Sequence, residues 1–376
     1  MLVANVSAEE SDDGEENHDP DIVEHSRSAI LIEAETGRVL YRKNENQRLF
    51  PASMTKIATM TLVMEALESG QLNLDTMVTT SKHAASIPGS TILLDENEQM
   101  SVEHLLKGVA IGSGNDAATA LAEKIGGSER LFVNMMNDHV RNLGLQNTTF
   151  QNPTGLSDRN QFSSAHDMAF LSRHLVNNHP KILEYTKIYE DWLRNDTDNP
   201  FWLVNTNKLV RHYEGIDGLK TGWTEEAGYC LSATIERDGM RLIAVVMGAE
   251  SAELRNQDII ALIEYGFANF EKRLLTESGH VVTQFNDIRF TRGPVNVVTD
   301  RNLYLVKRRA EELRPVEYRF NLDLSRIHEL EHVNVGTLEV FYDGRLHDTL
   351  TLNLEAPIQR NNVFNVFLSL LRKLFA

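Results

Sequence analysis

The sequence predicts an α+β fold, in which an antiparallel sheet has helices packed against it and a helical lobe beside it, and a small all-β domain follows. Strand patterns near residue 30 and after residue 213 are separated by a mostly helical region at residues 75–195. After residue 278 the pattern changes to short strands, and the last segment, 358–376, follows helical spacing. Because strands and helices come in separate runs instead of alternating, a parallel α/β sheet is not expected.

Length, charge and cysteine content limit the class of protein. At 376 residues the chain has room for two domains, and its net charge of -17 argues against binding nucleic acid, whose phosphates would be repelled. The single cysteine, Cys230, excludes an internal disulfide and a cysteine-based zinc cluster. No long apolar run is present, so no segment is expected to span a membrane.

The first segment, residues 1–26, contains nine acidic residues and no lysine or arginine. Such a segment cannot bury a core, and we expect a disordered tail. Val6-Ser7-Ala8 has the small residues of a secretory cleavage site, although the basic and long apolar parts of a signal are missing. We therefore expect an exported protein.

A β-hairpin and a central helix follow the tail. Residues 29–34 and 38–42 flank a glycine-containing turn. Pro51 suits the first turn of the next helix, which runs to Leu67 and ends before Gly70. Apolar residues surround this helix almost completely, as in a helix buried at the centre of a domain.

The remaining elements are predicted from periodicity and turn residues. Helices are expected at 102–110, 117–125, 129–143 and near 164–176, strands at 215–221, 229–236 and 241–248, and a closing helix at 252–270. The last two of these strands are joined at Asp238-Gly239, a strong hairpin signal. Six short strands are expected in the β domain, at 281–285, 295–299, 303–307, 316–322, 337–342 and 346–352.

We divide the chain accordingly into a tail at 1–26, a first domain at 27–275, a β domain at 276–357 and an amphipathic helix at 358–376. This helix either packs on the β domain or lies in a membrane surface. An exported protein with no other anchor favours the membrane surface.

Three short motifs carry the candidate chemistry. Ser53 and Lys56 are three residues apart near the start of the central helix, so their side chains share a face. A buried amine loses its proton readily, and a neutral lysine beside a serine is a nucleophile with its base. Chance alone places roughly one or two Ser-x-x-Lys matches in a chain of this length. The motif therefore indicates little by itself.

The second and third motifs give the first its weight. Ser113-Gly114-Asn115 lies between two predicted helices, where Asn115 or Asp116 is expected to cap the second. Lys220-Thr221-Gly222 ends a predicted strand that continues into Trp223. Each motif alone is more often structural, but the three in this order, separated by 60 and 107 residues, match a known catalytic set.

With these motifs the sequence resembles the penicillin-recognising serine enzymes, and among them the low-molecular-mass penicillin-binding proteins of D-alanyl-D-alanine carboxypeptidase type. The resemblance covers residues 27–275 through the motifs and the rest of the chain through the β domain and the terminal helix. It implies a penicillin-binding/β-lactamase-like transpeptidase domain. It also implies removal of the terminal D-alanine from peptidoglycan stem pentapeptides, covalent binding of β-lactams, action at the outer face of the cytoplasmic membrane, and no cofactor or metal.

The resemblance assigns catalytic roles to five residues. Ser53 would attack the carbonyl between the two terminal D-alanines and form an acyl-enzyme, while Lys56 accepts its proton. Ser113 would relay a proton to the departing D-alanine, and Asn115 would hold the substrate amide. Lys220 would favour neutral Lys56 and attract the terminal carboxylate.

The same resemblance assigns substrate binding to the strand of the third motif. Thr221 would hydrogen-bond the carboxylate, with Gly222 next to it, and the backbone N–H groups of Ser53 and Trp223 would form an oxyanion hole. Arg255 lies where the family often has an arginine that orients the carboxylate. A solvated charge on a helix face is the alternative interpretation of Arg255.

Two residues depart from the family pattern. Trp223 lies where relatives often have histidine, tyrosine or phenylalanine, and Thr154 lies where many have histidine. None of the 13 histidines has metal-ligand spacing in the sequence, and we expect them to be structural or surface residues.

Three other functions remain open from the sequence. A class A-like β-lactamase needs a carboxylate that activates the deacylating water, but the nearest candidate, Glu190, lacks that family's pattern and precedes Lys220 by only 30 residues. A D,D-endopeptidase that cleaves peptidoglycan cross-links would use the same motifs. A non-catalytic envelope scaffold would not need all five catalytic residues.

Overall fold

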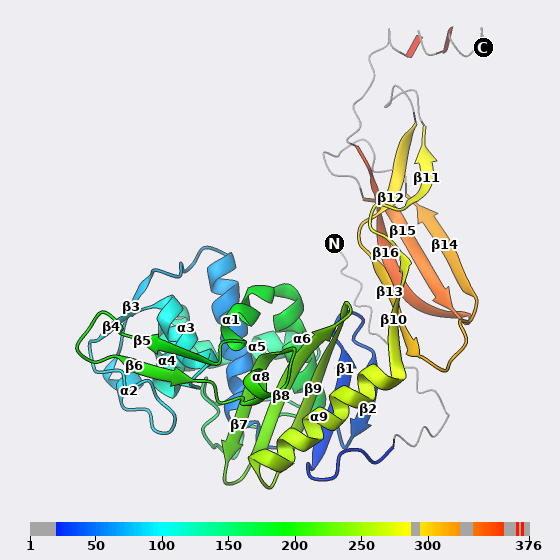
Figure 1. Cartoon of the computed structure of the whole chain (residues 1–376). Helices are drawn as coiled ribbons and strands as arrows, with labels where there is room; N and C mark the ends of the chain where they lie inside the picture. Colours follow the sequence, from blue (N-terminus) through cyan, green and yellow to red (C-terminus); the bar gives the residue numbers. More distant parts are fainter. Residues whose placement is uncertain (1–19, 287–293, 324–333, 357–365, 368–369, 372–376) are drawn as a thin grey trace. The chain divides into compact units, whose positions relative to one another are not determined.

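The computed structural model describes residues 20–286, 294–323, 334–356, 366–367 and 370–371 (Figure 1). The chain divides into two compact units, one of Met1–Glu236 with Arg241–Tyr265 and one of Arg237–Met240 with Gly266–Ala376. Within the described ranges, no helix has both the length and the apolar character needed to cross a membrane.

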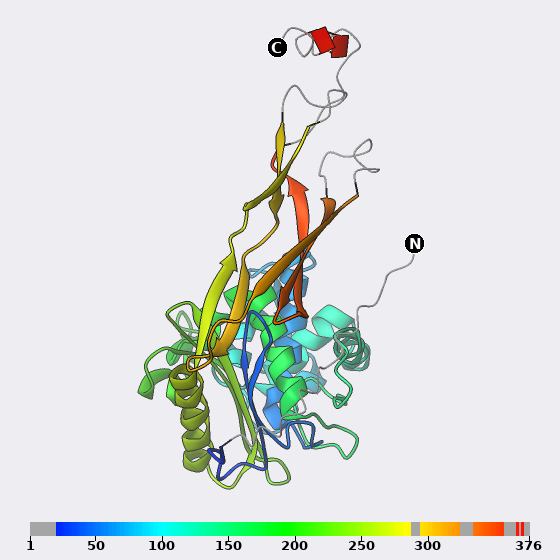
Figure 2. The ribbon, with the colours of Figure 1, turned by 90° about the vertical axis from the view of Figure 1, so that its right-hand side faces the viewer.

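The first unit is built on a sheet in the order β2 (Val39–Lys43), β1 (Ser28–Glu33), β9 (Met240–Ala249), β8 (Gly228–Arg237) and β7 (Ile216–Thr224). Strand β1 pairs antiparallel with β2 and β9, and β7 with β8. Helix α9 (Ala252–Asn269) covers one face, while α1 (Lys56–Glu68) and α6 (Ala165–Asn178) lie on the other (Figures 1 and 2). The predicted α+β fold is confirmed.

The helical lobe lies between β2 and β7 in the chain. It contains α2 (Lys82–Ala85), α3 (Val102–Ala110), α4 (Asn115–Gly126) and α5 (Glu129–Asn142), the strand pair β3 (Met77–Thr79) and β4 (Gln99–Ser101), and the short helices η2 (Pro180–Ile182), α7 (Leu183–Thr186) and α8 (Leu209–His212). Ser101, Ser128 and Ser164 cap α3, α5 and α6, each accepting a hydrogen bond from a first-turn N–H.

Helix α4 begins differently from the prediction. Its N-cap is Gly114, which has no side chain to form a cap, so the expectation that Asn115 or Asp116 caps this helix is wrong. The Asp116 carboxylate instead accepts hydrogen bonds from the backbone N–H groups of Ile92 and Leu94, at 3.0–3.1 Å. It therefore fixes the loop that precedes β4 against the start of α4.

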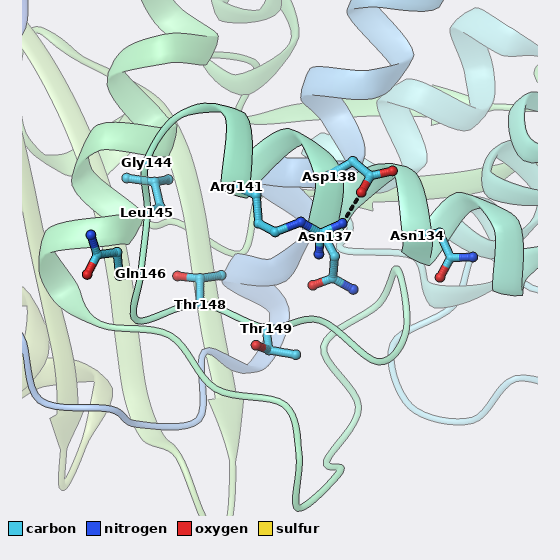
Figure 3. A pocket seen from close by; sticks show the side chains of 9 residues that line it. All are labelled: Asn134, Asn137, Asp138, Arg141, Gly144, Leu145, Gln146, Thr148 and Thr149. Carbon is cyan, nitrogen blue, oxygen red and sulfur yellow. Dashed lines mark hydrogen bonds and ion pairs between the residues drawn. The ribbon is translucent and has the colours of Figure 1, made fainter. Parts of the chain in front are cut away.

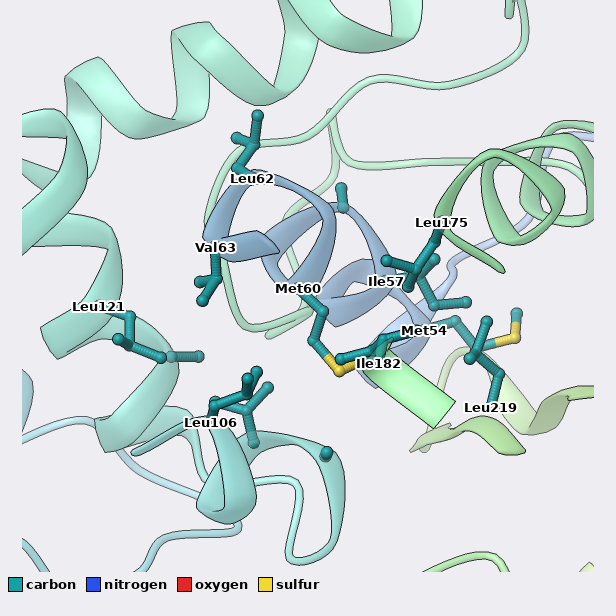
Figure 4. Close-up of a cluster of buried hydrophobic side chains, with 14 of the residues drawn as sticks. Met54, Ile57, Met60, Leu62, Val63, Leu106, Leu121, Leu175, Ile182 and Leu219 are labelled. Atoms are coloured by element: carbon teal, nitrogen blue, oxygen red, sulfur yellow. The ribbon is translucent and has the colours of Figure 1, made fainter. Parts of the chain in front are cut away.

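The central helix is buried on nearly all sides, as predicted. It starts with a 3-10 turn, η1 (Ala52–Thr55), and continues as α1 to Glu68, with Ser69 as its C-cap and Gly70 at φ +75°. Its apolar side chains, among them Met54, Ile57 and Met60, contact others from the surrounding helices and from β7 (Figure 4). Packing on every side fixes the position of the helix start, where Ser53 and Lys56 lie.

The hairpin of β5 (Glu190–Leu193) and β6 (Phe201–Val204) was not predicted. Its two tryptophans, Trp192 and Trp202, stack with ring centroids 6.1 Å apart and are about half exposed. Half-exposed aromatic residues give no clear period-2 pattern, and the helical neighbours on both sides obscured the strands.

The second unit consists mostly of strands in its described residues, apart from the end of α9 and the helical residues 366–367 and 370–371. It contains a pair, β10 (Phe270–Thr276) with β13 (Leu303–Arg308), and a sheet in the order β11 (Val281–Phe285), β12 (Val295–Thr299), β16 (Arg345–Leu354), β15 (Asn334–Tyr342) and β14 (Val316–Leu322). The six predicted strands are present, and β10 was missed. Asp343 and Gly344 both have positive φ, as a type I′ hairpin turn requires.

The two ends of the chain are described only in part. Residues 1–19 of the predicted tail lie outside the described residues. The predicted helix at 358–376 also lies outside them, apart from residues 366–367 and 370–371, which are helical. The amphipathic helix therefore stays a prediction.

Residues 22–26 of the expected tail pack against α9. Val23 is fully buried, and the carboxylate of Asp258, 2% exposed, accepts hydrogen bonds from the backbone N–H groups of Glu24 and His25 and from Ser26 Oγ at 2.6 Å. The expectation of a disordered tail is therefore wrong for residues 22–26, where one buried carboxylate accepts hydrogen bonds from three donors.

We expect Asp258→Ala to lower the free energy of unfolding by about 1–3 kcal/mol, because it leaves buried donors without an acceptor. Urea unfolding of the variant measures this loss. Gln257→Ala, an exposed position on the same helix, is the matched control. Equal stability of both variants would contradict the anchoring role of Asp258.

Candidate active site

Ser53 lies in the η1 turn, and two glycines press against the backbone of that turn. A Cβ added at Gly155 would lie 1.9 Å from the carbonyl oxygen of Ala52, and one added at Gly222 would lie 2.7 Å from that of Pro51. Ala52 itself has φ +46°, a conformation that costs an L-residue free energy. The loop of Gly155 and the strand β7 therefore hold the turn that contains Ser53 from two sides, without room for side chains.

The amine of Lys56 joins three segments of the chain. Its Nζ lies 3.1 Å from Ser53 Oγ, and it donates to Asn115 Oδ1 and to the carbonyl oxygen of Thr154, both at 2.6 Å. A neutral amine has two N–H groups and one lone pair. In that form, hydrogens donated to Asn115 and Thr154 would leave the lone pair for the Ser53 hydroxyl, whereas a protonated amine would donate to all three oxygens.

The surroundings of Lys56 favour this neutral form. The side chain is fully buried, and burial lowers its pKa well below the ordinary value, with the nearby charge of Lys220 acting in the same direction. The carboxylate of Asp116 raises the pKa but does not offset the burial. Desolvation is thus the main reason why the amine can accept a proton.

Asn115 and Ser113 occupy the start of α4 beside Lys56. The Asn115 amide receives the Lys56 hydrogen bond on Oδ1 and donates through Nδ2 to the carbonyl of Pro88 at 2.7 Å. Ser113 is 4% exposed and has φ +61°. The structure thus connects Asn115 directly to the Ser53–Lys56 pair and places Ser113 two residues before it, at the turn into α4.

Strand β7 carries the third motif at the edge of the sheet. Lys220 is 1% exposed and donates to the carbonyl oxygen of Thr221, and burial followed by the nearby charge of Arg255 lowers its pKa to about 7. Thr221 Oγ1 donates to Thr206 Oγ1 at 2.8 Å. Trp223 is 57% exposed and lies against Tyr229.

Arg255 lies on α9 and is 4% exposed, so it is not a solvated charge. Its guanidinium donates to Asn256 Oδ1 at 2.9 and 3.2 Å, and burial lowers its pKa. Because its charge lowers the pKa of Lys220, Arg255 contributes a positive potential at this lysine that persists when the lysine is neutral.

One contributor to the site was missed from the sequence. In the loop 152–155, Asn152 Oδ1 accepts from the backbone N–H groups of Thr154 and Gly155, at 3.2 and 2.7 Å, and the loop presents the Thr154 carbonyl to Lys56. A side-chain motif cannot reveal a backbone acceptor, although the Asn-Pro-Thr-Gly turn pattern marked the loop.

Two other features lie apart from this site. Glu190 is exposed on β5, and the described partners of Lys56 include no carboxylate. A pocket of about 770 Å³ at the end of α5 holds the ion pair of Arg141 and Asp138 (Figure 3). None of the predicted site residues lines this pocket, whose walls are Asn134, Asn137, Asp138, Arg141, Gly144, Leu145, Gln146, Thr148 and Thr149.

Known proteins are similar to this chain in sequence and in fold. The family model described as D-alanyl-D-alanine carboxypeptidase matches residues 14–251, which include every predicted site residue except Arg255. D-alanyl-D-alanine carboxypeptidase DacF of Bacillus subtilis is 44% identical over 297 residues, covering 79% of this chain and 76% of the relative.

Solved structures agree over most of the chain. Penicillin binding protein 5 from Haemophilus influenzae has a TM-score of 0.74 and 30% identity, covering 91% of this chain and 99% of that chain. Penicillin-binding protein D2 from Listeria monocytogenes, in the cefotaxime bound form, has a TM-score of 0.60 and 33% identity, covering 66% of this chain and all of that chain.

We expect the stability conferred by Lys220 to depend on pH. Its folded pKa of about 7 lies below an unfolded value of about 10.4, so between these values the unfolded chain holds a proton that the folded chain lacks. Relative to Lys220→Met, wild-type stability should therefore rise from about pH 7 to about pH 9, by up to about 1.4 kcal/mol per pH unit.

Urea unfolding of both proteins across this range measures the effect. Lys187→Met, at an exposed lysine, controls for the loss of a lysine elsewhere. A stability difference between wild type and Lys220→Met that stays constant with pH would contradict the lowered pKa.

Proposed function

The chain belongs to the D-alanyl-D-alanine carboxypeptidase family, and on that premise we propose that Ser53 is the nucleophile that removes the terminal D-alanine from peptidoglycan stem peptides. The observation that carries the proposal is the contact of 3.1 Å between Ser53 Oγ and Lys56 Nζ. In its neutral form the amine would donate its two hydrogens to Asn115 and Thr154, and its lone pair would accept the serine proton.

The reaction would proceed through an acyl-enzyme on Ser53, which water then hydrolyses. Ser53 Oγ attacks the carbonyl carbon of the penultimate D-alanine, and its proton passes to Lys56 Nζ. The C–N bond to the terminal D-alanine breaks, and a proton relayed through Ser113 converts the leaving nitrogen to an amine. Water releases the shortened peptide from Ser53, with Lys56 as base again.

Strand β7 would bind the end of the substrate. The positive potential of Lys220 and Arg255 suits the terminal carboxylate, and Thr221 Oγ1 would turn from Thr206 to donate to it. Asn115 would hold the substrate amide while it keeps Lys56 oriented.

The oxyanion hole would form between the nucleophile turn and β7. The close approach of Gly222 to Pro51 supports this, because it brings the two backbones together near the N–H groups of Ser53 and Trp223. One such donor is typically worth about 3–4 kcal/mol in the transition state. Because the donor at position 223 would be a backbone N–H, a tryptophan side chain there does not remove the oxyanion hole.

β-Lactams would acylate the same serine, as they present a reactive amide with a nearby carboxylate. The Listeria relative in its cefotaxime bound form supports this proposal. A class A-like β-lactamase is less well supported, because Glu190 is exposed on β5. An intact Ser53–Lys56–Asn115 network argues against a scaffold without catalysis, while an endopeptidase would use the same groups.

We propose that the enzyme acts outside the cytoplasm, where its peptidoglycan substrate lies. Residues 27–275 would form the peptidase domain and 276–357 a β domain that serves as a spacer or interaction module. The amphipathic pattern at 358–376 would attach the protein to the membrane surface. Deleting residues 360–376 should release the protein from membrane vesicles, and undiminished binding would argue against this attachment.

The nucleophile is tested by intact-protein mass spectrometry after incubation with benzylpenicillin, followed by peptide mapping. We expect one adduct, on Ser53, and none on the Ser53→Ala variant, because this hydroxyl lies beside an amine whose pKa is well below its ordinary value. Ser69→Ala, at an exposed serine at the end of the same helix, should be labelled like wild type. An adduct that persists on Ser53→Ala would refute the assignment.

The substrate is tested with a stem pentapeptide and a cross-linked dimer. We expect release of free D-alanine from the pentapeptide, with Ser53→Ala at least about 1,000-fold slower, since the nucleophile is lost. Preferential cleavage of the dimer would instead favour the endopeptidase.

A further inference from the structure

Helices α1, α5 and α6 bring together side chains that the sequence keeps far apart. Glu65 comes from α1, His139 from α5 and His174 from α6. One donor atom from each lies within 4.8 Å of the others. We propose that these three side chains bind a divalent transition-metal ion, and that their donors suit Zn²⁺. The expectation that the histidines show no ligand arrangement holds for sequence spacing, but not for the folded chain.

The distances fit a metal centre with small adjustments. Glu65 Oε1 lies 3.3 Å from His139 Nδ1 and 3.9 Å from His174 Nε2. Zinc binds imidazole nitrogen and carboxylate oxygen at about 2.0–2.2 Å, which places tetrahedral ligands about 3.4 Å apart. The distance between Glu65 Oε1 and His139 Nδ1 is already close to this value. Rotation of the side chains would bring the other two pairs of donor atoms to it. Two imidazoles and one carboxylate leave a fourth position for water.

Two buried ring nitrogens in this cluster lack a hydrogen-bond partner among the described residues. They are Nε2 of His139 and Nε2 of His174. The two rings meet edge to face, with centroids 4.8 Å apart. A buried polar atom without a partner costs about 1–3 kcal/mol. Coordination through Nε2 would remove this cost at His174, whereas His139 faces Glu65 with Nδ1 and its Nε2 needs a separate acceptor.

Neighbouring side chains can orient the ligands. Nδ2 of Asn178 lies 2.9 Å from Nδ1 of His174. Turning this amide by 180° presents its oxygen, which accepts Nδ1–H and leaves the Nε2 lone pair for the metal. Next to it, His179 Nδ1 lies 2.9 Å from Glu68 Oε2, which extends the polar cluster along the end of α1.

The position of the cluster indicates a structural role for the ion. Glu65 follows Lys56 by nine residues, about 14 Å along α1, too far for contact with the reacting atoms. The ion would join α1 to α5 and α6 and so steady the helix that presents Ser53 and Lys56. The Glu65 side chain is 39% exposed, which gives the ion a path from solvent.

The test uses the full chain, stripped of metal, and Zn²⁺ alone. We expect one Zn²⁺ per chain by competition with a chromophoric chelator, an X-ray absorption shell of nitrogen and oxygen at about 2.0–2.1 Å, and a Tm that rises on adding Zn²⁺. Glu65→Gln and His139→Ala should each weaken Zn²⁺ binding by at least about 100-fold and abolish the rise in Tm. His83→Ala, at an exposed histidine that also pairs with a glutamate, should behave as wild type.

Two results would overturn the proposal: no Zn²⁺ retained by the wild type, or Zn²⁺ binding that Glu65→Gln leaves unchanged. Glu65→Gln preserves the shape of the side chain, so the test stands even where His139→Ala does not fold. Labelling of Ser53 by benzylpenicillin in Glu65→Gln separates this proposal from the assignment of the nucleophile, because it should persist without the ion.

Discussion

The arrangement of the candidate active site depends on one buried amine, that of Lys56. Lys56 has no water to satisfy its hydrogens, so it must find acceptors in the protein. It finds them in Asn115 at the start of α4 and in the Thr154 carbonyl of a loop, and so ties both to the helix that carries Ser53. Burial makes these hydrogen bonds necessary and also lowers the pKa of the amine. The contacts that order the site and the basicity of Lys56 therefore have the same cause.

The backbone around Ser53 is fixed by close approach more than by side-chain contacts. Gly155 and Gly222 let a loop and an edge strand touch the turn that contains Ser53, and any Cβ would push them away. The turn keeps its uncommon conformation at Ala52 because the core of α1 surrounds it. Strain at the site is thus offset by packing elsewhere in the helical lobe.

Helix α1 connects the two parts of the molecule that carry chemistry. Its first turn presents Ser53 and Lys56, and its last turns present Glu65 to the histidines of α5 and α6. Because apolar packing covers most of the middle of the helix, its charged residues, Lys56, Glu65 and Glu68, lie toward the two ends. A buried helix of this kind cannot shift at one end without disturbing the other, which couples the stability of the lobe to the geometry of the nucleophile.

The sequence by itself determined most of the helices and strands and indicated the candidate site residues. Hairpin turns such as Asp238-Gly239, the apolar helix after Pro51 and the three motifs act within a few residues of one another, where local patterns can be read. Only the tertiary structure decided that Lys56 meets an amide 59 residues away and a carbonyl 98 residues away, and that His139 and His174 meet Glu65. These contacts depend on how buried helices pack and on which polar atoms then lack water, and local periodicity does not encode either.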